Sequence, residues 1–144
     1  MNRPKRKGLM TELRVMLAFI ELGYSVSSPY GDCERYDFIA DVDGRMLRIQ
    51  CKSAKPIQGV AFDVECRRTY YRQGGDHRMI KYQPGEVDYF ATWYEGQTYL
   101  IPFEDGKVKT RLRVAPPKIK AHGVNYAEDY EIEKVLEELK GVKE

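Results

Sequence analysis

The sequence predicts an α+β protein in which a mixed β-sheet is flanked by helices. A helical pattern is expected near each end of the chain, and the segments between them have the character of strands. Strands and helices do not alternate regularly along the chain, so a βαβ repeat is not expected. The chain has 144 residues, of which 42% are hydrophobic and 32% charged, so we expect a single globular domain over residues 1–144.

The first element is expected to be an amphipathic helix over residues 8–22, which Gly23 ends. The basic segment 1–7 is interpreted as an arm before this helix, and it is not typical of a secretory leader. Glu12 lies beside the apolar stripe of the helix, either as an edge residue or as an acid of a functional site. The apolar residues that recur at helical spacing are Leu9, Met10, Leu13, Met16, Leu17, Phe19 and Ile20.

The most informative segment is a β-hairpin over residues 36–53. Asp43-Gly44 separates two strand-like stretches, and this dipeptide favours a type I′ turn. Pairing Val42 with Arg45 across that turn places Asp37 opposite Gln50, with their Cβ atoms roughly 5 Å apart. Because side chains alternate along a strand, Lys52 shares the face of Gln50. An acid, an amide and a lysine are therefore expected to converge at the open end of the hairpin.

The rest of the chain continues the sheet and closes it with a helix. Residues 60–66 are expected to form a strand, and residues 67–81 a basic loop with two tyrosines and a Gly-Gly pair. Residues 87–94 and 97–102 are expected to form a second hairpin around Glu95-Gly96. Residues 128–140 are expected to form the terminal helix, whose apolar stripe either forms an interface or closes the core.

Positive charge is concentrated in three blocks, although the formal net charge is only +2. The blocks lie at residues 1–7, 67–81 and 107–120, while the segment from Glu128 onward is mainly acidic. Each block alone is either a solvated surface or a phosphate-binding one. Together they favour a nucleic-acid partner.

Other classes of protein are not supported by the sequence. The three cysteines fit neither a disulfide framework nor a zinc site, which favours a reducing cytoplasm. The apolar stretches are too short to span a bilayer, so no membrane partner is expected. Neither a phosphate-binding GxxxxGK[ST] loop nor a serine nucleophile elbow is present.

The chemistry at the hairpin is suited to a magnesium ion. Mg²⁺ prefers oxygen ligands and retains several waters, so few protein ligands suffice. Asp37 offers a carboxylate, Gln50 an amide oxygen, and Cys51 its backbone carbonyl. A lysine beside such a site, here Lys52, orients an attacking water or offsets charge that develops on phosphate.

These residues resemble the core of the PD-(D/E)xK nuclease superfamily. The resemblance rests on the helix with Glu12, the loop 27–32, Tyr36-Asp37 and Gln50-Cys51-Lys52, and it covers roughly residues 8–104. Within the superfamily, the chain looks most like the small group I intron homing endonucleases. Two positions depart from the usual pattern: Tyr36 replaces a proline, and neutral Gln50 replaces an acid.

The resemblance implies a restriction-endonuclease-like core and a metal-dependent endodeoxyribonuclease. Asp37 and Gln50 would bind Mg²⁺, or alternatively Mn²⁺, with support from Glu12, and Lys52 would act on the water or the transition state. The implied activity is site-specific double-strand DNA cleavage of the homing type. Two alternatives stay open: a four-way DNA junction resolvase on the same fold, and a non-catalytic DNA-binding module that retains the nuclease scaffold.

DNA contacts are expected mainly from the basic segment 67–81, whose alternative role is a flexible loop. Arginine and aromatic side chains beside a Gly-Gly pair suit insertion into a DNA groove. Because one domain presents one active site, cutting two strands favours a homo-oligomer, a dimer or tetramer. The expected DNA-binding residues are Ser28, Arg67, Arg68, Tyr70, Tyr71, Arg72, His77, Arg78 and Lys81.

Overall fold

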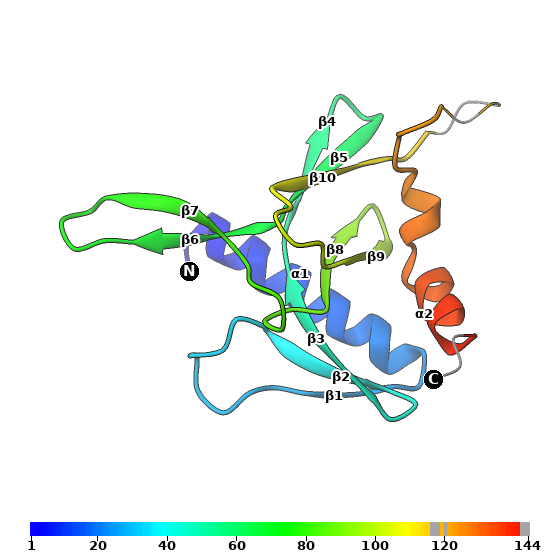
Figure 1. Cartoon of the computed structure of the whole chain (residues 1–144), viewed down its shortest axis with the longest axis horizontal. Coiled ribbons are helices and arrows are strands. Elements are labelled where there is room, and N and C mark those ends of the chain that lie inside the picture. Colours follow the sequence, from blue (N-terminus) through cyan, green and yellow to red (C-terminus); the bar gives the residue numbers. More distant parts are fainter. Residues whose placement is uncertain (116–118, 120, 142–144) are drawn as a thin grey trace.

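The computed structural model describes residues 1–115, 119 and 121–141 (Figure 1). Two α-helices, one short 3-10 helix and ten strands make up this part of the chain. The elements are α1 (Arg3–Glu21), β1 (Ser25–Ser27), β2 (Phe38–Val42), β3 (Arg45–Cys51), β4 (Ala54–Ile57), β5 (Ala61–Glu65), β6 (Arg67–Tyr71), β7 (His77–Lys81), β8 (Tyr89–Tyr94), β9 (Gln97–Pro102), β10 (Lys109–Arg113), η1 (Ala127–Tyr130) and α2 (Ile132–Lys140).

The central sheet has five strands in the order β1-β2-β3-β8-β9. Strand β3 pairs with β8 in parallel, and the other neighbours are antiparallel, so the sheet is mixed as the sequence predicts. A three-stranded antiparallel sheet, β10-β5-β4, and the separate two-stranded ribbon β6-β7 complete the strands.

The Asp-Gly hairpin has the expected register from its turn to Phe38 and Ile49, but the ladder does not extend to the expected pair of Asp37 and Gln50. Asp43 and Gly44 both have positive φ, at 53° and 88°, as a type I′ turn requires. The Asp41 carboxylate accepts a 2.8 Å hydrogen bond from the Gly44 N–H, which holds the turn. Val42 pairs with Arg45, and the ladder continues to the pair of Phe38 and Ile49.

Two cores lie on opposite faces of the central sheet. On one face, both helices and the β2-β3 hairpin contribute to one core, where Phe19 of α1 meets Phe38 of β2 edge-on with ring centroids 5.8 Å apart. Such an aromatic pair adds about 1 kcal/mol beyond the area it buries. On the other face, Phe62 of β5 stacks on Tyr94 of β8 at 4.6 Å and joins the small sheet to the large one.

The first helix differs from its expected bounds and orientation. It begins at Arg3 because Asn2 caps it by accepting a 3.0 Å hydrogen bond from the Lys5 N–H, so the segment 1–7 is helical from Arg3 instead of a separate arm. Its buried residues are Thr11, Val15 and Phe19; of the expected apolar stripe, only Phe19 is fully buried.

Other expectations about the elements are met in part. The hairpin β8-β9 turns at Glu95 and Gly96 as expected. The basic segment 67–81 is a strand pair and not a loop. The terminal helix is divided into η1 and α2, which meet at Glu131. Lys118 and Lys120 of the third basic block lie outside the described residues.

All three cysteines are free thiols: Cys33 is exposed, Cys51 half-buried and Cys66 buried. Among the described residues, no helix is long and apolar enough to cross a membrane.

Candidate active site

Asp37 lies immediately before β2, where the hairpin leaves its regular ladder. Its N–H donates to the carbonyl of Ile49 at 2.8 Å, one residue out of the register of the ladder. Its carboxylate accepts a 2.7 Å hydrogen bond from the Cys51 N–H. Burial raises the pKa of the Asp37 carboxyl, and the Cys51 hydrogen bond and the Lys52 charge oppose that rise. The site thus contains a desolvated acid at the open end of the hairpin.

Lys52 follows β3 directly and is held from several sides. Its N–H continues the parallel pairing by donating to the carbonyl of Ala91 at 2.8 Å. Its ammonium donates to the carbonyl of Arg67 at 2.8 Å and lies 5.0 Å from the centre of the Tyr82 ring. Burial lowers the pKa of Lys52, and the negative charge of Asp37 partly restores it.

Glu12 approaches the same site from α1. It is half-buried, and burial together with the nearby charge of Asp37 raises the pKa of its carboxyl. Burial raises the pKa of the Cys51 thiol, and the negative charges of Asp37 and Glu12 raise it further. The helix therefore delivers a second carboxylate to the end of the hairpin, consistent with the interpretation of Glu12 as a site acid.

Gln50 occupies the position between Ile49 and Cys51 in β3 and is half-buried. Within the described residues, no group of three or more His, Cys, Asp or Glu side chains could hold a metal ion. Glu12 and Asp37 are the two acids whose charges act on one another here, so an amide oxygen or a backbone carbonyl would have to complete a metal site between them. Such an oxygen-only donor set fits Mg²⁺ or Mn²⁺.

The basic segment forms a ribbon that projects from the body of the protein (Figure 1). The arginines of the ribbon surround an aromatic side chain: the guanidinium carbons of Arg68 and Arg78 lie 6.0 and 5.5 Å from the centre of the Tyr70 ring. Near its turn, Tyr71 contacts His77, with ring centroids 6.2 Å apart. A projecting two-stranded ribbon of this kind fits the major groove of DNA.

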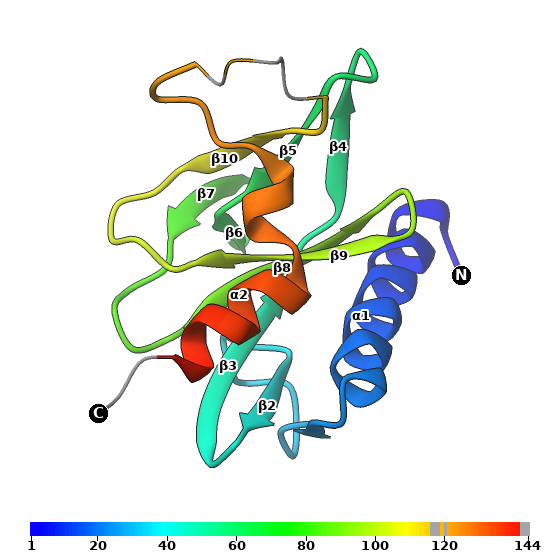
Figure 2. The ribbon, with the colours of Figure 1, turned by 90° about the vertical axis from the view of Figure 1, so that its right-hand side faces the viewer.

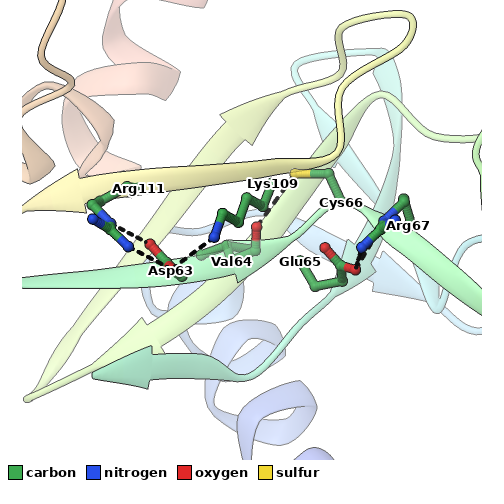
Figure 3. Close-up of polar contacts among 7 residues, drawn as sticks. All are labelled: Asp63, Val64, Glu65, Cys66, Arg67, Lys109 and Arg111. Carbon is green, nitrogen blue, oxygen red and sulfur yellow. Dashed lines mark hydrogen bonds and ion pairs between the residues drawn. The ribbon is translucent and has the colours of Figure 1, made fainter. Parts of the chain in front are cut away.

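The root of the ribbon is held by ion pairs, as Figure 3 shows. Arg67 donates two hydrogen bonds to the Glu65 carboxylate, at 3.0 and 2.7 Å. Nearby, Arg111 of β10 forms a two-bond pair with Asp63 of β5, which faces it in the ladder. Arg67 is among the residues expected to bind DNA, but in this structure its guanidinium is paired with a carboxylate of the protein itself.

The remaining expected DNA-binding residues are less closely tied to the site. Arg72 and Lys81 are exposed on the ribbon, at its turn and its root. Ser28 is exposed in the loop that follows β1, away from the ribbon segment of the chain.

Sequence reasoning missed two side chains around Lys52. Tyr82 is buried, with its ring beside the lysine, and the charge of Glu65 raises the lysine's pKa. Neither residue belongs to a recognisable motif. Both come close to Lys52 only because of where the ribbon joins the sheet.

A mixed sheet with two acids and a lysine at the end of one hairpin defines a nuclease core. The chain belongs to the PD-(D/E)XK endonuclease family, whose model matches residues 2–133. Members of this family generally use divalent metal ions.

Two individual proteins illustrate this similarity. Protein 5.3 of Escherichia phage T7 is 26% identical over 114 residues, which cover 79% of this chain and 92% of that protein. A solved structure, that of the bacterial homing endonuclease I-Ssp6803I, superposes with a TM-score of 0.73 over 99% of both chains. At 21% sequence identity this second likeness shows the shared fold.

Proposed function

We propose that the protein is a site-specific double-strand DNA endonuclease of the homing type that depends on Mg²⁺, with Mn²⁺ as the alternative ion. The observation that carries the proposal is the convergence of Glu12, Asp37 and Lys52 next to a projecting basic ribbon. Acids with raised pKa values near one another are a mark of functional sites, because a bound cation offsets their mutual repulsion.

In this proposal Asp37, Gln50, Glu12 and the Cys51 carbonyl hold the metal ion. The ion supplies Lewis-acid activation of the phosphate and of a water molecule. Lys52 orients the attacking water or offsets the charge that develops on the phosphate as the new P–O bond forms and the old one breaks. The hydrogen bond to the Arg67 carbonyl and the nearby Tyr82 ring restrict where the Lys52 ammonium lies.

The test is cleavage of supercoiled and linear DNA with Mg²⁺ by the variants Asp37→Asn and Lys52→Ala. We expect each to lower the cleavage rate by at least about 100-fold, the scale of losing one charge-stabilising group. DNA affinity, measured by fluorescence anisotropy, should be unchanged. A variant of either kind that cuts at the normal rate contradicts the site assignment.

The same assay separates the alternatives. Preference for a four-way junction over a linear duplex would indicate a resolvase. DNA binding without nicking at any Mg²⁺ concentration would indicate a non-catalytic module, the alternative that neutral Gln50 supports.

Gln50 is tested by adding a negative charge to the site. Gln50→Glu should lower the Mg²⁺ concentration needed for half-maximal cleavage, by roughly tenfold for about 1.4 kcal/mol of added attraction. Gln50→Met, which has similar size but no amide oxygen, should raise it. If neither variant changes the Mg²⁺ dependence, Gln50 is not a ligand.

A further inference from the structure

The outer face of α1 is apolar although no described element covers it. Figure 2 shows the helix at the edge of the molecule. Thr11, Val15 and Phe19 face the sheet, and at 100° per residue the opposite side of the helix carries a second apolar set. Its members are 42–56% exposed: Leu9, Met10, Leu13, Leu17 and Ile20.

This surface, here called the α1 outer face, is not a scatter of single apolar residues. Leu9, Leu13 and Leu17 follow one another at intervals of four, which forms a continuous ridge along the helix. Met10 and Ile20 extend it on either side. A contiguous apolar patch of this kind marks an interaction surface.

The charges at the two ends of α1 indicate which partner fits. The first two turns are basic, with Arg3, Lys5 and Arg6 and no acid in the first turn. The last turn contains Glu21 and no basic residue. This arrangement opposes the helix's own dipole, which favours acids at the N-terminus and bases at the C-terminus. An antiparallel helix of the same sequence would bring the basic end of one copy to the acidic end of the other.

We propose that the α1 outer face binds the same face of a second copy of this chain, as an antiparallel helix pair with its two-fold axis at Leu13. Leu13 then meets its own counterpart, and Leu9 meets Leu17 of the second copy. Arg6 falls opposite the second copy's last turn, close to Glu21. Helix axes in such pairs lie about 8–10 Å apart, which lets these side chains interlock.

The pairing would also place two active sites usefully, a consequence that depends on the proposed function. Glu12 adjoins Leu13 and points about 100° away from it around the helix. A two-fold axis perpendicular to both helices keeps the Glu12 residues of the two copies on the same side of the pair. One duplex lying against that side would meet both sites, as cutting two strands requires.

The first test is the mass of the protein in solution, measured by sedimentation velocity over a range of concentrations. We expect a dimer or a multiple of it for the natural chain and a monomer for Leu13→Lys, which places two ammonium groups on the axis. The matched control is Met46→Lys, because Met46 of β3 is equally exposed, at 55%, and lies outside the α1 outer face. Monomers of the natural chain at all concentrations, or equal association of Leu13→Lys, overturn the proposal.

The second test is the direction of pairing. In a Cys33→Ser background, which removes the exposed thiol, Leu13→Cys should form a disulfide-linked dimer upon mild oxidation. Leu9→Cys should not, because antiparallel pairing separates the two residues 9 by about 12 Å along the helix. Equal cross-linking of both variants would indicate parallel pairing and contradict the proposal.

A charge exchange completes the test. Glu21→Arg should raise the dimer dissociation constant, and adding Arg6→Glu should restore it; failure of the double variant to recover contradicts the pairing of these ends. All three readouts are independent of cleavage. A dimer without nuclease activity would reject the proposed function alone, and an active monomer would reject the helix pair alone.

Discussion

At the scale of single residues, the candidate site is defined by charges held in an unfavourable environment. Burial raises the pKa of both acids, Asp37 and Glu12, and lowers that of Lys52. The protein compensates these charges incompletely, since the Cys51 N–H and Lys52 only oppose the shift at Asp37. Such residual cost is typical of a site that awaits a charged ligand.

This cost predicts a pH-dependent stabilisation by metal. Because the folded-state pKa values of Asp37 and Glu12 are raised, the stability they contribute is present below their unfolded values, near 4, and is lost as pH rises through the folded values. A cation that binds the ionised acids should offset this loss. At Mg²⁺ about 100-fold above its dissociation constant, we expect Tm to rise by roughly 9 °C at neutral pH.

The measurement is differential scanning calorimetry with and without Mg²⁺ at neutral pH and near pH 4. The shift should vanish in acid, where the carboxyls are protonated. Asp37→Asn serves as the control and should show little shift at either pH. An equal shift in acid would place the metal elsewhere.

At the scale of elements, the two hairpins that build the site differ in how visible they are in the sequence. The β2-β3 hairpin has apolar and polar residues in alternation around Asp43-Gly44, because one of its faces packs on the helices. The β6-β7 ribbon shows no such alternation because both of its faces are largely exposed. For this reason the sequence predicts a loop where the structure has a strand pair.

The ion pair of Arg67 with Glu65 distinguishes this arginine from the other arginines of the ribbon, which we expect to bind DNA. Changing Arg68, Arg72 and Arg78 together to Gln should reduce the slope of log affinity against log salt by about 3, at roughly 0.9 for each phosphate that is no longer neutralised. Arg67→Gln should change the slope by less than about 0.9, because Arg67 is paired with Glu65. Fluorescence anisotropy titrations across a series of KCl concentrations measure both. An unchanged slope in the triple variant would remove the ribbon from the DNA interface.

At the scale of the whole molecule, both helices contribute to the core, but they differ in how many apolar side chains they leave exposed. The terminal helix closes the core, with Ile132 and Leu136 buried. The first helix, which has more apolar residues, directs Leu13 and Leu17 away from the core.

This contrast between the helices predicts a large difference in the free energy of unfolding between two leucine substitutions. Leu136→Ala removes a side chain that is 2% exposed and should lower the free energy of unfolding by about 2–5 kcal/mol. Leu13→Ala removes one that is 56% exposed and should change the stability of the monomer by at most about 0.5 kcal/mol. Urea denaturation at a concentration where the chain is monomeric compares the two. Similar losses would mean that the α1 outer face packs within the monomer.

Features that depend on local geometry could be predicted from the sequence. The type I′ turn at Asp43-Gly44 follows from two residues that tolerate positive φ, and the register of β2 with β3 follows from that turn. The mixed sheet and the family likeness follow from the order of elements and from Asp37, Gln50 and Lys52.

Features that depend on contacts between distant segments could not be predicted and required the three-dimensional structure. One example is the contact of Lys52 with the Arg67 carbonyl and the Tyr82 ring. Two others are the ion pair of Arg67 with Glu65 and the exposure of Leu13. The helical spacing of apolar residues predicts that they share a face of the helix. When a helix has two apolar faces, the spacing does not predict which of them the sheet will cover. That choice is made by packing, since the face that bears Val15 and Phe19 meets the hairpin and leaves the leucines outside.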